Sequence, residues 1–587
     1  METTVTDVLV VGAGPTGLVA SALLAKYGID SVTVTKHEDT ALSPRAHIVN
    51  QRSVEIFREL GVEDEVMRVG TPIRALGNNV WATSFAGPEL ARLRAWGTGP
   101  ERRGEYLAAS PCELVNAPQH LLEPVLLSGA RKAGADIRFG HELGEFTEYP
   151  DHVLATVRDH GEGTEYRVQA RYVIGADGGR SLTAKQAGIG YEDESGVLNW
   201  AANVWLEADL TEYCAHRPAA LYWIYRPGDG FHCTTWICVR PWTEWVMAVV
   251  FPEQHEEPPV LDHETALAYA RGMIGDPAVD VRVKSVNTWS VGQALAGEFR
   301  KGRVLLAGDS AHRHPPPNGL GSNTGMQDAH NLAWKLAMVV QGHAGDELLD
   351  SYHTERKETG RVVVDSVMRS LRNLTPLAEA FGFAPGRSEE ETWARIAELS
   401  ADTTRGRERR RELREAVELQ HHQYNCHGVE CGLPYTGGAL VHDDGLPPRE
   451  PSAGERLRFR ASTRPGSPVP HAWLEHLGTP LSTVDVVGNG VFTLVTGIGG
   501  QPWVRAADQV ARALGTPITT AVVGYQQQYH DVYGHWAALR EIDDTGCLLV
   551  RPDRYVAWRR HRLTADPAGD LAVAVKTVLG KEDDGRR

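Results

Sequence analysis

Apolar positions in the first 35 residues form a strand-like run, a helix-like run and a second strand-like run. Residues 8–11 (VLVV) are continuously apolar, which predicts a short buried strand. Residues 18–25 are apolar or small, as in a helix packed on a sheet, and residues 31–35 (SVTVT) are rich in β-branched side chains, as in a second strand. This order predicts a β–α–β unit in an α/β fold.

The same kinds of pattern recur further along the chain. Residues 172–175 and 303–307 (RVLLA) predict two more buried strands, and residues 326–340 predict a long helix. Aromatic-rich runs between Gly, Pro and charged residues predict further strands, which we expect to form a mostly antiparallel sheet. These aromatic-rich runs are residues 219–227, 231–241 and 244–251.

The last third of the chain changes character twice. Residues 387–420 are charged and helical in pattern, and the basic run 405–411 is typical of a solvated helix face. Residues 447–466 are rich in Pro, Gly and Arg, which is typical of an irregular stretch at the entry to a last domain. Beyond them, strand patterns at 483–497, 517–525 and 547–558 alternate with a helix pattern at 506–515, which predicts a separate α/β domain.

Length, charge and cysteine content narrow the class of protein. A chain of 587 residues is long enough for several domains, and its net charge of −16 argues against nucleic acid or an anionic membrane as partner. Seven cysteines without a CxxC pair, no basic N-terminal leader and no long apolar run predict a cytoplasmic protein without a membrane segment. The His and Cys residues between 421 and 431 match no regular zinc spacing, so we expect no metal.

A glycine motif follows the first predicted strand. Gly12, Gly14 and Gly17 form GxGxxG, which lets the backbone turn tightly and leaves a helix N-terminus open to a pyrophosphate. The second strand of such units usually ends in Asp or Glu, which binds ribose hydroxyls. Here the place holds Thr35 followed by Lys36, so the ribose contact departs from the usual pattern.

Two further strand-end turns complete a family pattern. Residues 172–181 (YVIGADGGRS) end in an Asp177-Gly178 pair, and residues 302–312 (GRVLLAGDSAH) carry Gly308-Asp309. With GxGxxG, these motifs resemble the single-component FAD-dependent aromatic hydroxylases. The segment HRHPPPNGLGSN, followed by QDAHNLAWKLA, is similar to their phenol and chlorophenol monooxygenase branch.

This resemblance implies an FAD site. Asp309 would bind the ribityl chain, Pro316, Gly319 and Gly321 would border the flavin ring, and the N–H groups near Ser322 and Asn323 would face its pyrimidine edge. Arg45, Gln119 and Asp177 would also contact FAD. The full set of predicted cofactor residues is Gly12, Gly14, Gly17, Thr35, Lys36, Arg45, Gln119, Asp177, Asp309, Pro316, Gly319, Gly321, Ser322 and Asn323.

The resemblance also implies an activity. NADH or NADPH would reduce FAD, O₂ would add to the reduced ring, and a flavin C4a-hydroperoxide would hydroxylate a small aromatic substrate. His47 is the first candidate for handling the substrate proton, and Tyr225 is the second. Open alternatives are a Baeyer–Villiger or ring-opening flavin oxygenase and a flavin scaffold without turnover. No WxWxIP-type segment is present, which argues against a halogenase.

The family pattern also predicts the domains. A Rossmann-like FAD domain is expected to combine residues 1–75, 105–190 and 299–385, and an antiparallel-sheet substrate domain to combine 76–104 and 191–298. A helical linker (386–435) would lead to a thioredoxin-like domain (436–587), redox-silent because it lacks CxxC. We expect a homo-oligomer.

Overall fold

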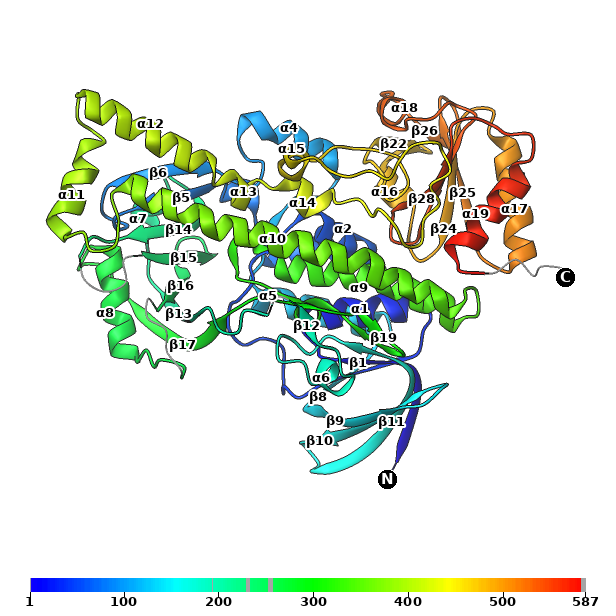
Figure 1. Cartoon of the computed structure of the whole chain (residues 1–587), viewed down its shortest axis with the longest axis horizontal. Helices are drawn as coiled ribbons and strands as arrows, with labels where there is room; N and C mark the ends of the chain where they lie inside the picture. Colours follow the sequence, from blue (N-terminus) through cyan, green and yellow to red (C-terminus); the bar gives the residue numbers. More distant parts are fainter. Residues whose placement is uncertain (1, 193, 229–232, 252–256, 582–587) are drawn as a thin grey trace.

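The computed structural model describes residues 2–192, 194–228, 233–251 and 257–581. It is a mixed α/β protein in which three large sheets carry most of the strands (Figure 1). The long helix α10 (Asp350–Phe381) crosses the molecule from the first sheet toward the second. The α/β class predicted from the alternating patterns is therefore confirmed.

The first sheet contains the predicted β–α–β unit. β1 (Thr3–Val11) and β2 (Ser31–Thr35) are parallel neighbours joined by α1 (Pro15–Lys26). On the other side of β1 lie β11 (Thr164–Gly175) and then β20 (Val304–Leu306), both parallel to it. β1 starts earlier than its apolar run predicts, because residues 3–6 pair with β11 although most of them are not buried.

Strand register brings three turns to one edge of this sheet. Val11, the last residue of β1, pairs with Gly175, the last of β11. Gly175 in turn pairs with Leu306, the last residue of β20. The turns that follow these strands are therefore neighbours, although they lie up to about 300 residues apart in the sequence. Parallel sheets bind ligands at this carboxyl edge.

Helices pack on one face of this sheet. α1 packs between α5 (Gln119–Lys132) and α9 (Gly321–Val340), and α9 packs against α10 (Figure 1). A small three-stranded sheet lies nearby, formed by β3 (Ile48–Val49), β7 (Val115–Asn116) and β4 (Thr71–Pro72). It carries the segment that contains His47 and joins the first sheet to the second.

The second sheet holds the aromatic-rich segments. Six of its strand pairings are described, and all are antiparallel except that of β14 with β5. Phe231 and His232, which belong to a predicted strand, lie outside the described residues. In spatial order the strands are β17 (Arg282–Val291), β13 (Asn199–Glu207), β16 (Glu244–Val250), β15 (Cys233–Arg240), β14 (Ala219–Tyr225), β5 (Asn78–Ala82) and β6 (Glu89–Arg94).

The two faces of this sheet differ in burial. Tyr222, Trp236 and Trp245 pack around Phe85 in a buried aromatic cluster, next to α8 (His263–Ile274). The opposite face alternates with it and is half-buried at Trp223, Thr235, Ile237 and Ala248. The first face is thus a structural core, while these side chains of the second face are partly exposed.

The third sheet belongs to the C-terminal domain. β24 (Phe492–Thr496), α17 (Gln501–Leu514) and β25 (Ile518–Gly524) form a parallel β–α–β unit. β27 (Cys547–Val550) pairs antiparallel with β24, and β28 (Val556–Arg560) follows it in a hairpin. A final helix, α19 (Pro567–Val578), packs against α17. This arrangement is thioredoxin-like.

Between the second and third sheets in the sequence, the charged segment forms helices, including α11 (Glu389–Glu398) and α12 (Thr404–Glu418), which lie at the outer end of the molecule near the second sheet (Figure 1). In the part of the chain that the structure describes, no helix combines the length and apolar character of a membrane span. The predicted domain boundaries remain predictions.

Candidate active site

The first turn of the site closes tightly on the neighbouring strand. Gly12 has φ +105°, and a Cβ there would collide with the carbonyl oxygen of Ala176, while a Cβ at Gly17 would collide with the carbonyl oxygen of Gly12. The Gly12 N–H donates to Val34 O (2.8 Å), which brings the end of β2 beside the turn. Neither Gly12 nor Gly17 has room for a side chain, so this tight turn into α1 requires glycine at both positions.

A second close contact joins α1 to the GD turn. A Cβ at Gly308 (φ +64°) would lie 2.6 Å from the Thr16 hydroxyl, and a Cβ at Gly325 on α9 would also collide with that hydroxyl. Thr16 therefore packs directly against both the GD turn and α9. Two of the three predicted motifs are in contact through this side chain.

Asp177 joins the third motif to the others. Its carboxylate accepts hydrogen bonds from Ser181 Oγ (2.5 Å), Ser310 Oγ (3.1 Å), Thr183 N (2.9 Å) and Thr183 Oγ1 (3.0 Å). Four bonds occupy the four acceptor positions of a carboxylate. The Asp177 side chain is thus fully used within the protein, and Ser310 links it to the GD turn.

Asp309 has the opposite surroundings. Its side chain is exposed, and among the described residues none donates a hydrogen bond to it. The exposed Arg45 likewise has no hydrogen-bond or ion-pair partner in the described part of the chain. Both side chains are available to a ligand at the edge where the turns meet.

A buried ionic group supports the GD turn from beneath. Asp328 is fully buried and accepts from Gly308 N (3.0 Å) and from Arg356 Nε (2.7 Å), and it bonds His312 Nε2 (2.7 Å). Burial opposes ionisation of Asp328, but Arg356 and His312 outweigh it and lower the pKa of the carboxyl. The role of Asp328 was not predicted from the sequence; the available signal was an acid four residues before the buried Leu332 in α9.

The proline-rich loop leads into an uncapped helix. Pro316 is exposed, Asn318 and Gly319 adopt left-handed φ values of 70° and 64°, and α9 begins at Gly321 without a side-chain cap. A Cβ at Gly321 would lie 3.7 Å from His314 Nε2, a buried atom to which no described residue forms a hydrogen bond. An open helix N-terminus beside an unpaired polar atom is suited to a polar ligand edge.

Ser322 and Asn323 lie in the first turn of α9. Asn323 is buried, and its side chain accepts from Asn50 N (2.9 Å) and Ser53 Oγ (2.8 Å) and donates to Ile48 O (2.8 Å). The amide therefore ties the helix start to the segment that carries His47. Its own N–H, with that of Ser322, is what the first turn leaves for a ligand.

Gln119 is held by a neighbouring acid. Its Nε2 donates to Glu123 Oε1 (2.5 Å), and Glu123 Oε2 accepts from Ala41 N (2.5 Å). Burial raises the pKa of Glu123, which lies close to Gly14. Thr35 is buried at the end of β2, where its hydroxyl accepts from His37 N (3.4 Å), and Lys36 is exposed.

His47 is oriented by an asparagine that sequence analysis did not select. Asn116 Nδ2 donates to Cys238 O on β15 (2.8 Å), which leaves its Oδ1 to face His47 Nδ1 at 2.7 Å. Since Oδ1 can only accept, His47 carries its proton on Nδ1 and presents the Nε2 lone pair. Burial lowers the pKa of His47 to about 4, so the ring is neutral near pH 7. The signal in the sequence was the nearness of Asn116 to Gln119.

Tyr225 lies on the half-buried face of the second sheet but is itself enclosed. Its ring is 5.3 Å from those of Phe381 and Phe383, and only 5% of the residue is exposed. Burial raises the pKa of Tyr225 well above its ordinary value. The side chain is packed as a core residue at the end of α10.

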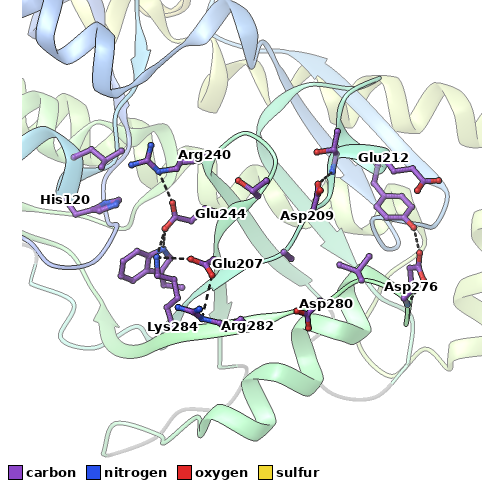
Figure 2. Close-up of a pocket in the computed structure, with 18 residues that line it drawn as sticks. His120, Glu207, Asp209, Glu212, Arg240, Glu244, Asp276, Asp280, Arg282 and Lys284 are labelled. Atoms are coloured by element: carbon purple, nitrogen blue, oxygen red, sulfur yellow. Dashed lines mark hydrogen bonds and ion pairs between the residues drawn. The ribbon is translucent and has the colours of Figure 1, made fainter.

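A large open groove of about 1250 Å³ lies at the end of the second sheet (Figure 2). Its lining includes six carboxylates and three cations, and Lys284 is paired with Glu207 and Glu244. His120, which follows Gln119, reaches its rim and packs on Trp205. None of the predicted site residues lines this groove, and its charged walls do not suit an apolar ring.

The His and Cys residues near position 427 have individual roles. His427 stacks on Tyr106 with ring centroids 3.6 Å apart and bonds Glu105 (3.0 Å) and Gln51 (2.9 Å). Among the described residues, no group of three His, Cys, Asp or Glu is placed to hold a metal ion.

Comparison with known families gives the class. Residues 5–367 match the model of the FAD binding domain, and residues 462–581 match that of the aromatic-ring hydroxylase C-terminal domain. A flavoprotein with a dinucleotide-binding domain and an appended hydroxylase domain is therefore the class that fold and site define.

Individual relatives sharpen this. The chain is 41% identical to 2,4-dichlorophenol 6-monooxygenase from Delftia acidovorans, over 98% of both chains, and 37% identical to phenol 2-monooxygenase from Pseudomonas sp. (strain EST1001), over 96% of this chain and 91% of that one. The crystal structure of the flavin-dependent monooxygenase PieE with FAD and substrate superposes with a TM-score of 0.95 at 43% identity, covering 99% and 100% of the chains. The chain belongs to the family of FAD-dependent aromatic-ring monooxygenases.

The residues at the strand edge fit FAD. The glycine turn leads into the N-terminus of α1, which has no side-chain cap and suits a pyrophosphate, and Asp309 and Arg45 lack protein partners in the described chain. The unpaired His314 Nε2 beside the N-terminus of α9 suits the polar edge of a flavin. FAD is the cofactor, with NAD(P)H as co-substrate.

Proposed function

We propose that the enzyme hydroxylates a phenolic or closely related aromatic ring, and that His47 accepts the hydrogen bond of the substrate hydroxyl. The observation that carries this proposal is the bond from His47 Nδ1 to Asn116, which leaves Nε2 as an acceptor. The names of the relatives, 2,4-dichlorophenol 6-monooxygenase and phenol 2-monooxygenase, support a phenolic ring.

FAD, once bound and reduced by NAD(P)H, supplies the oxygen chemistry. The protein contributes binding, orientation and exclusion of water. The Asp309 carboxylate and the N-termini of α1 and α9 would hold the cofactor. The half-buried sheet face with Trp223, Thr235 and Ile237 would cover the ring of the substrate, because it offers apolar area with one hydroxyl.

The pKa of His47 limits its role. With a pKa of about 4, the His47 imidazole is too weak a base to remove the proton of a phenol, whose ordinary pKa is about 10, as for a tyrosine side chain. It accepts a hydrogen bond instead, and so polarises the O–H bond and enriches the ring as the electrophilic oxygen approaches. A homo-oligomeric assembly is a further part of this proposal.

The test compares each phenol with its methyl ether in wild type and His47→Ala. We expect the variant to retain FAD while its hydroxylation rate on phenols falls about 100-fold, the lower end for a general acid–base group. Methyl ethers should react slowly with both proteins. The matched control is His120→Ala. It also removes a histidine, but His120 packs on Trp205 and has no part in the bond between His47 and Asn116. Equal turnover of phenol and ether by wild type would refute the acceptor role.

A further inference from the structure

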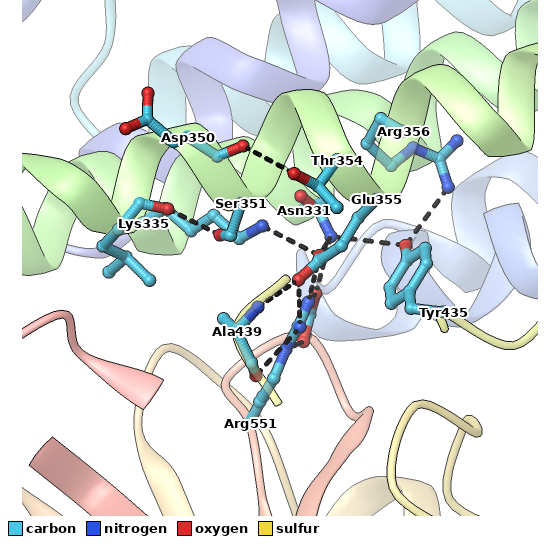
Figure 3. Close-up of polar contacts among 12 residues, drawn as sticks. Asn331, Lys335, Asp350, Ser351, Thr354, Glu355, Arg356, Tyr435, Ala439 and Arg551 are labelled. Carbon is cyan, nitrogen blue, oxygen red and sulfur yellow. Dashed lines mark hydrogen bonds and ion pairs between the residues drawn. The ribbon is translucent and has the colours of Figure 1, made fainter. Parts of the chain in front are cut away.

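A cluster of buried charges joins the C-terminal domain to α9 and α10 (Figure 3). Glu355 on α10 accepts from Lys335 Nζ on α9 (2.8 Å) and from Arg551 Nη1 and Nη2 (2.7 and 2.9 Å). Arg551 also pairs with Asp553 (2.5 Å). The four side chains are at most 1% exposed, and their two positive and two negative charges balance.

Aromatic rings exclude water from this cluster. The Arg551 guanidinium lies 5.2, 5.4 and 5.7 Å from the ring centres of Trp334, Tyr435 and Tyr555. Charges in such surroundings interact strongly, and removal of one leaves its partner uncompensated. If Arg551 is replaced, the remaining charged side chains, including Lys335 on α9, must therefore shift to compensate for the lost charge.

Hydrogen bonds extend from this cluster to the next helix turn. Asn331 Nδ2 on α9 donates to Glu355 Oε2 (2.7 Å) and to the Tyr435 hydroxyl (3.3 Å). The same hydroxyl accepts from Arg356 Nη1 (3.2 Å), as Figure 3 shows. Tyr435 thus bridges the charge cluster and Arg356.

Arg356 connects this bridge to the GD turn. Its Nε donates to Asp328 Oδ1 (2.7 Å), and Asp328 Oδ2 accepts from the Gly308 N–H (3.0 Å). Gly308 precedes Asp309, the exposed carboxylate predicted to bind FAD. A continuous series of buried polar contacts therefore runs from Arg551 to the turn that presents Asp309.

We propose that Arg551 is a positioning residue for FAD, through which the C-terminal domain fixes the GD turn and α9. Arg551 lies inside the segment that matches the hydroxylase C-terminal domain, whereas Glu355, Asp328 and Gly308 lie inside the FAD-domain match. The domain that lacks CxxC thereby has a defined task in cofactor binding. The inference rests on the FAD site and is independent of which ring is hydroxylated.

The experiment measures FAD affinity and the visible spectrum of bound flavin in full-length Arg551→Met. We expect the dissociation constant for FAD to rise at least tenfold and the flavin band to shift, because the GD turn and the start of α9 are no longer held in one position. Arg551→Lys, which keeps the charge, should recover part of the affinity.

The matched control is Arg559→Met. Arg559 is a similarly buried arginine of the same domain. It pairs with Asp444 (2.8 Å) and Glu541 (3.1 Å), and both of these partners lie outside the FAD-domain match. FAD affinity in this variant should stay within twofold of wild type. Equal losses of affinity in both variants would mean that general destabilisation is responsible and would overturn the proposal.

Tyr435→Phe decides the matter if Arg551→Met does not fold. It removes only the bridging hydroxyl, while the ring keeps its stack on Tyr555 (4.3 Å between centroids). We expect a three- to fivefold weaker FAD affinity with an unchanged far-ultraviolet spectrum. Wild-type FAD affinity and flavin spectrum in Tyr435→Phe would refute the proposal. An enzyme inactive on phenols would leave it intact, since no step of this test depends on hydroxylation.

Discussion

Two strand–glycine–helix units of this chain look alike in sequence but differ in use. β1 and α1 are joined by GAGPTG, and β24 and α17 by GIGGQP. In each, a Cβ on the first glycine would meet a backbone carbonyl of a neighbouring loop: Ala176 O for Gly12, and Asp544 O at 2.5 Å for Gly497. Tight turning alone therefore does not distinguish them.

The strands and loops beside the two glycine turns do distinguish them. β1 lies between parallel strands, so the turns after β11 and β20 end beside its own and leave Asp309 without a partner in the described chain. β24 has an antiparallel neighbour, β27, and the loop before it closes over the turn. There Thr496 Oγ1 donates to Gly546 O (2.7 Å), and Trp503 Nε1 donates to Thr545 O (3.0 Å). A glycine turn serves a ligand where the protein leaves its surroundings open.

The sharpest test of this contrast substitutes the first glycine of each unit. In Gly12→Ala, φ +105° and the Ala176 carbonyl both oppose a side chain, so the turn must shift away from the pyrophosphate position. We expect FAD affinity to fall more than about 100-fold, measured by fluorescence titration of apoprotein. Gly497→Ala should lower the melting temperature but leave FAD affinity within about threefold. Loss of FAD in Gly497→Ala alone would reverse the assignment.

The two aspartates extend the contrast within the first sheet. Asp177→Ala removes four hydrogen bonds and should destabilise the apoprotein by about 2–4 kcal/mol, seen in denaturant unfolding. Asp309→Ala removes an exposed carboxylate and should leave the stability of the apoprotein unchanged. Its FAD affinity should fall about 10- to 100-fold, the range for hydrogen bonds to a charged group. A stability loss in Asp309→Ala would show that its carboxylate is also a structural group.

Local pattern predicted the parts of the fold that local forces determine. The β-branched run 31–35 became β2 with the same ends, because every one of its side chains is buried. The register that aligns Val11, Gly175 and Leu306 could not be obtained from pattern, since it depends on pairing between distant strands. The three motifs were nevertheless grouped correctly by their resemblance to a family.

The site was predictable where a motif is made of backbone, and less so where side chains act in pairs. Gly12 and Gly319 show why: their positive φ values favour glycine whichever distant residues surround them. Asp328 and Asn116 were missed because their roles depend on partners about 20 to 120 residues away, such as Cys238. An isolated polar residue on a helix or short strand gives no sign of such a partner.

The pH dependence of hydroxylation tests whether His47, like Asp309, keeps an atom free for a ligand. Its pKa of about 4 lies below the ordinary value near 6.5, so folding favours the neutral ring. The stability contributed by this group is complete above pH 6.5 and is lost as pH falls toward 4. We expect the ratio of wild-type to His47→Ala hydroxylation rates to be constant from pH 6 to 8 and to shrink near pH 4. A step in that ratio near pH 6.5 would mean that the ring titrates normally.

Tyr225→Phe should give the smallest effect, because the Tyr225 side chain is enclosed by other side chains of the core. The ring packs between Phe381 and Phe383, and burial raises the pKa of the Tyr225 hydroxyl well above its ordinary value, so the hydroxyl stays protonated near pH 7. Phenylalanine preserves that packing, so we expect the hydroxylation rate and the ratio of product to NAD(P)H consumed to change less than about twofold. Trp223→Phe, on the same strand face but half-buried, is the matched variant and should alter the KM for substrate more than Tyr225→Phe does. A tenfold loss of rate in Tyr225→Phe would move this hydroxyl into the active site and would show that enclosure by aromatic rings does not exclude a catalytic role here.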